Sequence, residues 1–214
     1  TGVNDADLTA TVASVNITGA GNVTVANQDN DNSAVTATVT GALSTGGALA
    51  VTNTETSTGD DVSLTIGGAT TVTGTTGITA GAFAGATANL VTTGNTAFTG
   101  AVTLTGGAGA GSNATLTLNG ATNSFAGGLS LATASKSLLT VASSTAQTVS
   151  GTITGSGAIT VDNAAGVTFS NAVTAGGITI EKAAGDSAAT FQAAVTAPIT
   201  LGGAGTGTNT VTFD

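Results

Sequence analysis

The sequence predicts an all-β protein folded as a parallel β-helix, or β-solenoid, and three observations predict it. First, Phe169, Phe191 and Phe213 follow one another at steps of 22 residues. Second, apolar residues around them alternate with Thr, as in Val167-Thr168-Phe169, which is the period-two pattern of a strand. Third, the alternating runs are separated by Gly, Asn and Asp, which form tight turns. A short repeat of strands and turns is what one coil of a solenoid requires.

The first third of the chain already carries strand patterns. Clusters of Asn and Asp at 4–7 and 27–32 indicate turns around two short strands. From residue 34 onward the alternation is regular and is bounded by Gly pairs. The strands predicted up to residue 73 are 15–18, 23–25, 34–39, 48–51, 62–66 and 71–73. No segment shows an apolar stripe of helical period, so we expect little helix.

Residues 74–95 are the least regular part, and we expect an irregular coil or a boundary there within one elongated domain spanning 1–214. Beyond them a motif recurs: an aromatic residue or Val, two residues, a small residue, an aliphatic residue, and Ser or Thr. It begins at Phe98, Phe125, Val149, Phe169 and Phe191. The spacing predicts coils of about 20–27 residues, because insertions in solenoids fall in the turns.

One coil can be folded from its residues. Between residues 167 and 182, turns at Asn171 and at the Gly pair 176–177 separate three short strands. The side chains predicted to point inward are Val167, Phe169, Val173, Ile178 and Ile180. The alternative architecture is a row of antiparallel β-sandwich domains, which also gives evenly spaced strands.

The composition limits the functions that the chain can serve. The net charge is −9, and the only two cationic residues are Lys136 and Lys182, which we expect to be surface charges. Binding to nucleic acid needs clusters of Lys and Arg, and an anionic membrane would repel this surface, so both partners are excluded. No apolar run is long enough to cross a membrane. The start at Thr-Gly-Val-Asn suggests a processed chain or one cut from a longer protein.

The phrases Val-Thr-Phe-x-x-Ala-Val-Thr and Gly-x-Ile-Thr-Ile, the bias toward Thr, Ala, Gly and Asn, and the lack of Cys resemble the passenger regions of bacterial autotransporters, including rickettsial outer-membrane surface proteins. They also resemble Thr-rich bacterial surface-layer proteins. The resemblance is best over residues 96–214. It implies export, a right-handed parallel β-helix and a role outside the cell, at the bacterial surface, and it supplies no active-site motif.

Catalytic chemistry has few candidates. The chain lacks His, Cys, Tyr and Arg, so Ser-His and Cys-His nucleophiles are excluded, as are zinc sites of the usual nitrogen and sulfur ligands. Asp162, Glu181 and Asp186 could form the carboxylate pair of a polysaccharide-cleaving enzyme, because they occupy similar positions in adjacent coils. The chain has no Trp or Tyr to hold a sugar. We therefore expect solvated turn carboxylates and no enzyme.

Calcium is the cation that suits this chain, because Asp- and Asn-rich loops supply the oxygen ligands that calcium prefers. Seven of the eleven acidic residues lie within the first 61 positions. The alternative is that these residues only form turns. The predicted ligands are Asp5, Asp7, Asp29, Asp31, Asp60 and Asp61.

Together these features predict a structural protein of the cell surface: a surface layer, a fibre or the stalk of an adhesin. We expect a self-associating rod that stacks end to end, or continues within a longer chain. Two alternatives remain: an adhesin that binds a glycan or a host protein, and a polysaccharide-degrading β-helix enzyme.

Overall fold

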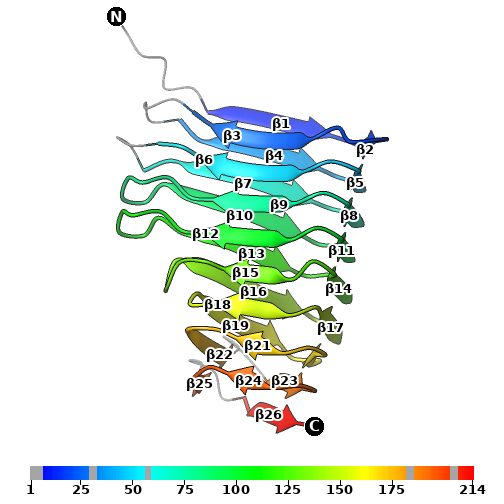
Figure 1. Cartoon of the computed structure of the whole chain (residues 1–214), viewed down its shortest axis with the longest axis vertical. Helices are drawn as coiled ribbons and strands as arrows, with labels where there is room; N and C mark the ends of the chain where they lie inside the picture. The colour runs from blue at the N-terminus through cyan, green and yellow to red at the C-terminus, as the bar shows by residue number, and fades with distance from the viewer. Residues whose placement is uncertain (1–6, 29–32, 56–58, 182–185, 203–206) are drawn as a thin grey trace, which may run out of the picture.

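The computed structural model describes residues 7–28, 33–55, 59–181, 186–202 and 207–214. In these ranges the chain forms 26 strands and no helix, so no helix there could span a membrane. The strands belong to three parallel sheets, which stack coil upon coil into an elongated body (Figure 1). The predicted parallel β-solenoid is confirmed, and the antiparallel sandwich alternative is wrong. The handedness of the coil stays a prediction.

Sheet A holds the longest strands, and their burial alternates because apolar side chains enter the core while Thr and other polar side chains face outward. It contains nine described strands in an unbroken order. They are β1 (Leu8–Val12), β4 (Val35–Val39), β7 (Asp61–Ile66), β10 (Thr87–Thr92), β13 (Ala114–Leu118), β16 (Ser137–Ser143), β19 (Ala158–Asn163), β22 (Gly177–Glu181) and β25 (Ile199–Gly202).

Sheet B follows sheet A along the chain in every coil and carries all the stacked phenylalanines. It also has nine described strands. They are β2 (Val15–Ile17), β5 (Leu43–Thr45), β8 (Thr70–Val72), β11 (Thr96–Phe98), β14 (Thr122–Phe125), β17 (Gln147–Ser150), β20 (Val167–Phe169), β23 (Ser187–Phe191) and β26 (Asn209–Phe213).

Sheet C completes each coil, and eight of its strands are described. They are β3 (Val23–Asn27), β6 (Leu49–Asn53), β9 (Thr76–Thr79), β12 (Val102–Thr105), β15 (Leu129–Leu131), β18 (Ile153–Gly155), β21 (Val173–Thr174) and β24 (Val195–Thr196). Residues 74–95, the stretch predicted to be irregular, contain β9 and β10, which pair in register with their neighbours in sheets C and A.

The coils shorten toward the C-terminal end. Val15 in β2 pairs with Leu43, 28 residues later, whereas Ile159 in β19 pairs with Ile178, 19 residues later. The difference lies largely in the connections between sheets C and A, such as residues 80–86 and 106–113, which project from the body (Figure 1). Insertions of this kind leave the strand ladder intact.

The interior is one hydrophobic cluster that runs from Val39 to Phe191. The coil folded from the sequence is confirmed, because Val167, Phe169, Val173 and Ile178 are all buried. So is the C-terminal aromatic ladder: the ring centroids are 5.0 Å apart for Phe169 and Phe191, and 5.8 Å apart for Phe191 and Phe213. Phe213 nevertheless lies 63% exposed, because it belongs to the last described strand.

A second aromatic stack, Phe98 on Phe125, has centroids 5.5 Å apart and lies in a different column of sheet B. The recurring motif aligned Val149 with Phe125, and this alignment is wrong. Val149 pairs with Asn123, two residues earlier, and then with Phe169. The two stacks are therefore offset by two residues along the strands.

Buried amides mark the place of this offset. The Nδ2 of Asn123 donates to the carbonyl of Gly120 at 2.8 Å, and the Nε2 of Gln147 donates to the carbonyls of Gly120 and Leu118 at 2.9 and 3.0 Å. Asn163 in turn donates to the Oε1 of Gln147 at 2.7 Å. These bonds satisfy polar groups that would otherwise be costly to bury.

Candidate functional site

Of the six acids predicted to bind calcium, the structure describes Asp7, Asp60 and Asp61, while Asp5, Asp29 and Asp31 lie outside the described residues. Asp7 and Asp61 stand in one column at the start of sheet A strands, because Leu8 pairs with Val35 and Val35 with Val62. They are two coils apart, about 9.6 Å at the usual strand spacing. The position between them in this column belongs to Ala34, whose side chain offers no oxygen ligand.

Each of these carboxylates instead bonds to the following coil. The Oδ1 of Asp7 accepts from the amide of Ala34 at 3.0 Å, and the Oδ1 of Asp61 accepts from the hydroxyl of Thr87 at 2.5 Å. Among the described residues no group of three or more acidic, His or Cys side chains is close enough to hold a metal. Calcium binding stays a prediction.

Sequence reasoning missed Glu55, the one acid in the described residues that is fully buried. Its Oε1 accepts from the Nδ2 of Asn27 at 2.6 Å, and its Oε2 accepts from the amide of Asp60 at 3.0 Å. Asn53 holds the same corner, because its Oδ1 accepts from the amide of Glu55 and its Nδ2 donates to the carbonyl of Asp60. The spacing of Asn27 and Asn53 by one coil was the available signal.

Asp60 belongs to this corner through its backbone. Its Oδ2 is buried and has no hydrogen-bond partner among the described residues, and the rest of the side chain is only half-buried. The corner that connects sheets C and A thus joins three coils through the side-chain amides of Asn27 and Asn53 and the carboxylate of Glu55.

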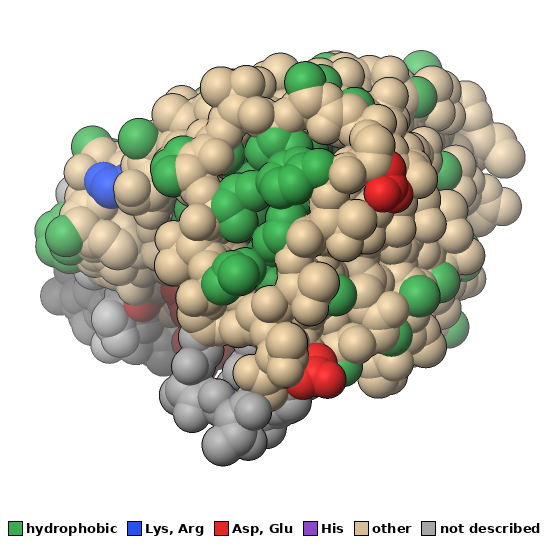
Figure 2. Space-filling view, turned by 90° about the horizontal axis from the view of Figure 1, so that it is seen from below, with side chains coloured by type: hydrophobic (Ala, Val, Ile, Leu, Met, Phe, Trp, Pro, Cys, Tyr) green, Lys and Arg blue, Asp and Glu red, His purple; other side chains and the backbone are tan. Residues whose placement is uncertain are grey.

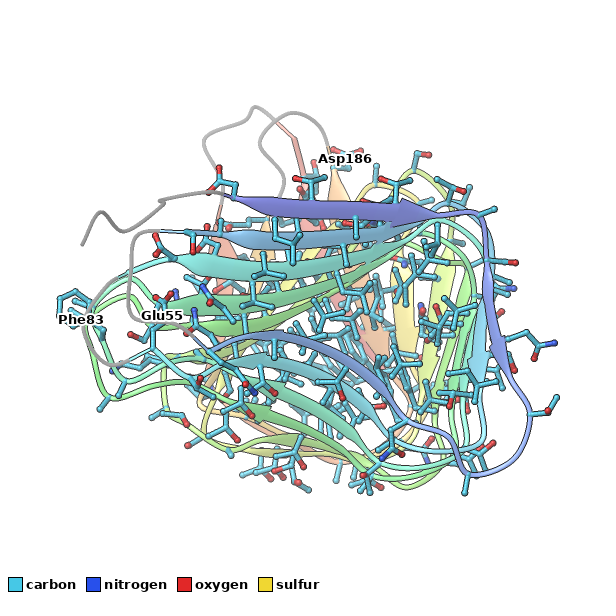
Figure 3. All side chains as sticks on the ribbon, turned by 90° about the horizontal axis from the view of Figure 1, so that it is seen from above. Glu55, Phe83 and Asp186 are labelled. Carbon is cyan, nitrogen blue, oxygen red and sulfur yellow. The ribbon has the colours of Figure 1, made fainter. Side chains whose placement is uncertain are left out.

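The loops next to this corner form the main projection on the side of the solenoid. Phe83, at 40% exposure, lies near Glu55, whose carbonyl accepts from the amide of Ala82 at 3.0 Å (Figure 3). The next loop is held by Lys136, whose Nζ donates to the carbonyls of Gly107, Ala108 and Gly109 at 2.8, 2.8 and 2.7 Å. The interpretation of Lys136 as a plain surface charge is therefore wrong: it is half-buried and clamps a loop.

The carboxylates considered for polysaccharide cleavage lie near the connection between sheets A and B. Val161 pairs with Ile180, so the next residues, Asp162 and Glu181, are neighbours on the outer side of adjacent coils. Their backbones are about one strand spacing, 4.8 Å, apart, and a retaining glycosidase places its carboxyl groups about 5–5.5 Å apart. The Oδ1 of Asp162 is buried without a partner among the described residues.

Asp186 lies on a different side of the solenoid from Glu55 (Figure 3). Its Oδ1 accepts from the amide of Thr208 at 2.7 Å, so this carboxylate bonds to the next coil. The pair of Asp162 and Glu181 stays a hypothesis for a hydrolytic site, and Asp186 has a structural bond.

A shallow hollow lies on the outer side of sheet C, where β12, β15 and β18 lie side by side. Its lining consists of small, aliphatic and hydroxyl-bearing residues and contains no carboxylate and no aromatic ring: Ala101, Val102, Thr103, Gly127, Gly128, Leu129, Ser130, Thr152 and Thr154. A surface of this kind offers hydrogen bonds to a ligand without charge.

Within the described residues, both ends of the solenoid present a last strand that pairs on one side only. At the N-terminal end every residue of β1 is exposed, including Leu8 at 60% and Val12 at 45%, and a hollow opens there between β1 and β3. At the C-terminal end Leu201 and Phe213 are 54% and 63% exposed. Figure 2 shows this end, with hydrophobic side chains gathered in the middle of the face and polar ones around them.

No family model, no curated protein and no solved structure matches this chain.

Proposed function

We propose that the chain is a structural protein of the bacterial surface, a stiff rod that associates end to end with further coils, in a surface layer, a fibre or an adhesin stalk. The observation that carries the proposal is the pair of open ends. Each of the three sheets stops, within the described residues, at a strand with a free edge: β1, β2 and β3 at one end and β24, β25 and β26 at the other.

Free edges of this kind pair readily with other strands. Their backbone N–H and C=O groups have no partner on one side, and proteins that stay monomeric usually protect such edges with charges, bulges or covering segments. Here the described edge strands carry Leu8, Val12, Leu201 and Phe213 in exposed positions and no lysine. At each end, unpaired backbone groups thus lie beside apolar side chains that would be buried if a further coil were added.

The direction of stacking follows from the sheets. All described strand pairs are parallel, so a second copy that adds its N-terminal end to the C-terminal end continues the same ladder. Phe213 would then lie against the first coil of the next copy, where sheet B begins at Val15. The placement outside the cell is supported by the composition, which is rich in Thr, Ala and Gly and free of Cys.

Electron microscopy at neutral pH tests the proposal. We expect rods several times the length of one chain. Phe213→Asp and Leu8→Asp should shorten them, because a charge would be desolvated at the contact. Thr148→Asp, on the outer side of sheet B, is the matched control and should leave the length unchanged. Uniform short particles formed by the unmodified chain would contradict end-to-end association.

A further inference from the structure

The outer face of sheet A differs from the other outer faces of the solenoid. At the middle outward position of each strand, from Thr11 in β1 to Thr200 in β25, the residue is Thr in every strand except β10, where it is Val91. The column two residues earlier also holds Thr, Ser or Asn, up to β16, where Leu138 points outward. We call these two columns the sheet A face.

Among the outward positions of the described strands, large apolar side chains occur only on this face. In the described strands of sheets B and C the outward positions hold Thr, Ser, Asn, Gly and Ala, without any larger apolar residue. Val91 and Leu138 lie on the central strands β10 and β16, on either side of β13, and they are surrounded by Thr. An apolar centre with a polar surround is the usual anatomy of a protein–protein interface.

The hydroxyl groups of the sheet A face are available to a partner. Thr side chains at the corners bond within the solenoid: Thr45 donates to the carbonyl of Gly21 at 2.6 Å, and Thr93 donates to that of Gly67 at 2.7 Å. The hydroxyls of the middle column make no hydrogen bond to any described residue. Each can both donate and accept, so a face of threonines can bond to a copy of itself.

The distribution of charge also favours the sheet A face as an interface. Neither column contains a charged residue, although the chain as a whole carries −9. The acids near this sheet stand at its margins: Asp7 and Asp61 where the strands begin, and Asp162 and Glu181 where they end. Two copies can therefore approach through the sheet A face without burying a carboxylate.

We propose that the sheet A face is an interface through which two copies of the chain pair side by side, with their solenoid axes antiparallel about a two-fold axis along β13. Nine strands at about 4.8 Å, with two outward columns that each take about 6.8 Å of strand length, give a footprint of roughly 600 Å² on each copy. A standard stable interface takes about 800 Å² from each partner. The pairing rests on the proposed structural role and extends it from rods to bundles or layers of rods.

This arrangement keeps like charges apart. With β13 at the centre, β7 lies opposite β19 of the second copy, so Asp61, at the start of its strand, and Asp162, at the end of its strand, fall on opposite margins. Val91 in β10 meets β16 of the second copy, the strand that carries Leu138. Leu138 lies two residues before Thr140, which is in the Val91 column, so the two apolar side chains are diagonal neighbours near the centre, about 6.8 Å apart along the strand.

The absence of cysteine makes a direct test possible. In Thr117→Cys the new thiol stands on the two-fold axis, and mild oxidation should convert most of the protein into a disulfide-linked dimer. Thr148→Cys, which points outward from β17 of sheet B and is more exposed than Thr117, is the matched control and should give at least fivefold less dimer. Equal yields from the two variants would overturn the proposal.

A second substitution separates pairing from chance collision. Leu138→Lys in the Thr117→Cys chain places a charge in the apolar centre and should reduce the dimer at least fivefold, whereas Thr168→Lys on sheet B should not. Circular dichroism checks that both variants remain folded. An unchanged yield with Leu138→Lys would show that the face does not bind a second copy. Phe213→Asp distinguishes the two associations: it shortens end-to-end rods but should leave the Thr117→Cys dimer.

Discussion

Glu55 is a buried acid held by hydrogen bonds from two neighbouring segments of the chain. Its carboxylate is buried, and its two oxygens accept from different donors, the side-chain amide of Asn27 and the backbone amide of Asp60. Glu55→Gln keeps the shape but offers only one acceptor oxygen, so one donor must face an NH₂ group. An unsatisfied buried donor costs about 1–3 kcal/mol.

We therefore expect Glu55→Gln to lower the free energy of unfolding by about 1–3 kcal/mol, measured by urea denaturation. The matched control is Glu181→Gln, at a half-buried outward position, which should change stability by no more than about 0.5 kcal/mol. If the two variants were equally stable, the network at this corner would not contribute to stability as the geometry indicates.

Lys136 gives a second prediction at the scale of one residue. Three carbonyl oxygens of residues 107–109 accept from its Nζ, and charge-assisted bonds are stronger than neutral ones. Lys136→Met retains the apolar stem and removes the donor. Hydrogen exchange of the amides of residues 107–112 should become several-fold faster, while the amides of β20 stay protected. Unchanged exchange in the loop would show that the backbone alone holds it.

Among the elements, the aromatic stacks show what the sequence can and cannot predict. The repeat at Phe169, Phe191 and Phe213 predicts a ladder because the three residues are equally spaced and point to the same side of their strands. The alignment of Val149 with Phe125 failed because side chains alternate with period two, so a shift by two residues keeps every side chain on its face. Periodicity cannot detect such a shift. Buried amide bonds accompany the shift: Gln147 donates to Leu118 and Gly120 of the preceding coil, and Asn123 donates to Gly120 within its own coil.

The regularity of the strands also decides which candidate sites could be predicted from the sequence. Asp162 and Glu181 could be placed side by side from the sequence, because their strands have clear alternation and their coils are similar in length. Glu55 could not, since Asn27 ends strand β3 whereas Asp60 lies in the connection to sheet A one coil later, and these connections vary in length from coil to coil. Lys136 was misjudged for a related reason: its bonds go to the backbone of a loop, which no side-chain pattern reveals.

The C-terminal aromatic ladder predicts that Phe191 and Phe213 contribute unequally to stability. Phe191 is buried between two rings, whereas Phe213 has only one neighbour and is 63% exposed. Phe191→Ala should cost about 3–5 kcal/mol, as expected for emptying a core position, and Phe213→Ala much less. Urea denaturation measures both variants. A similar loss for the two would mean that Phe213 is covered in solution, for example by a second copy.

The calcium prediction concerns the acidic residues of the first coils. If they bind the ion, calcium stabilises the folded state, and the melting temperature should rise as calcium chloride is added, by an amount that grows with concentration. Sodium chloride at the same ionic strength is the control for screening, and EDTA should reverse the shift. Identical melting temperatures in the two salts and in EDTA would show that these acidic residues bind no calcium and only form turns.

At the scale of the whole molecule, charge opposes association and the surfaces favour it. Each chain carries −9, so two copies repel one another at long range, while the open ends and the sheet A face present apolar and hydroxyl groups. Salt shortens the screening length from about 30 Å at 0.01 M to about 10 Å at 0.1 M. Association should therefore strengthen as sodium chloride is raised over this range.

Sedimentation velocity at a fixed protein concentration follows this effect, with the average sedimentation coefficient expected to increase with salt. An assembly held by ion pairs behaves in the opposite way, because salt weakens its contacts. Leu138→Lys and Phe213→Asp then assign the increase: the first should remove the part due to side-by-side pairing, and the second the part due to stacking of ends. A sedimentation coefficient that falls with salt would contradict both modes of association, since neither surface contains an ion pair among the described residues.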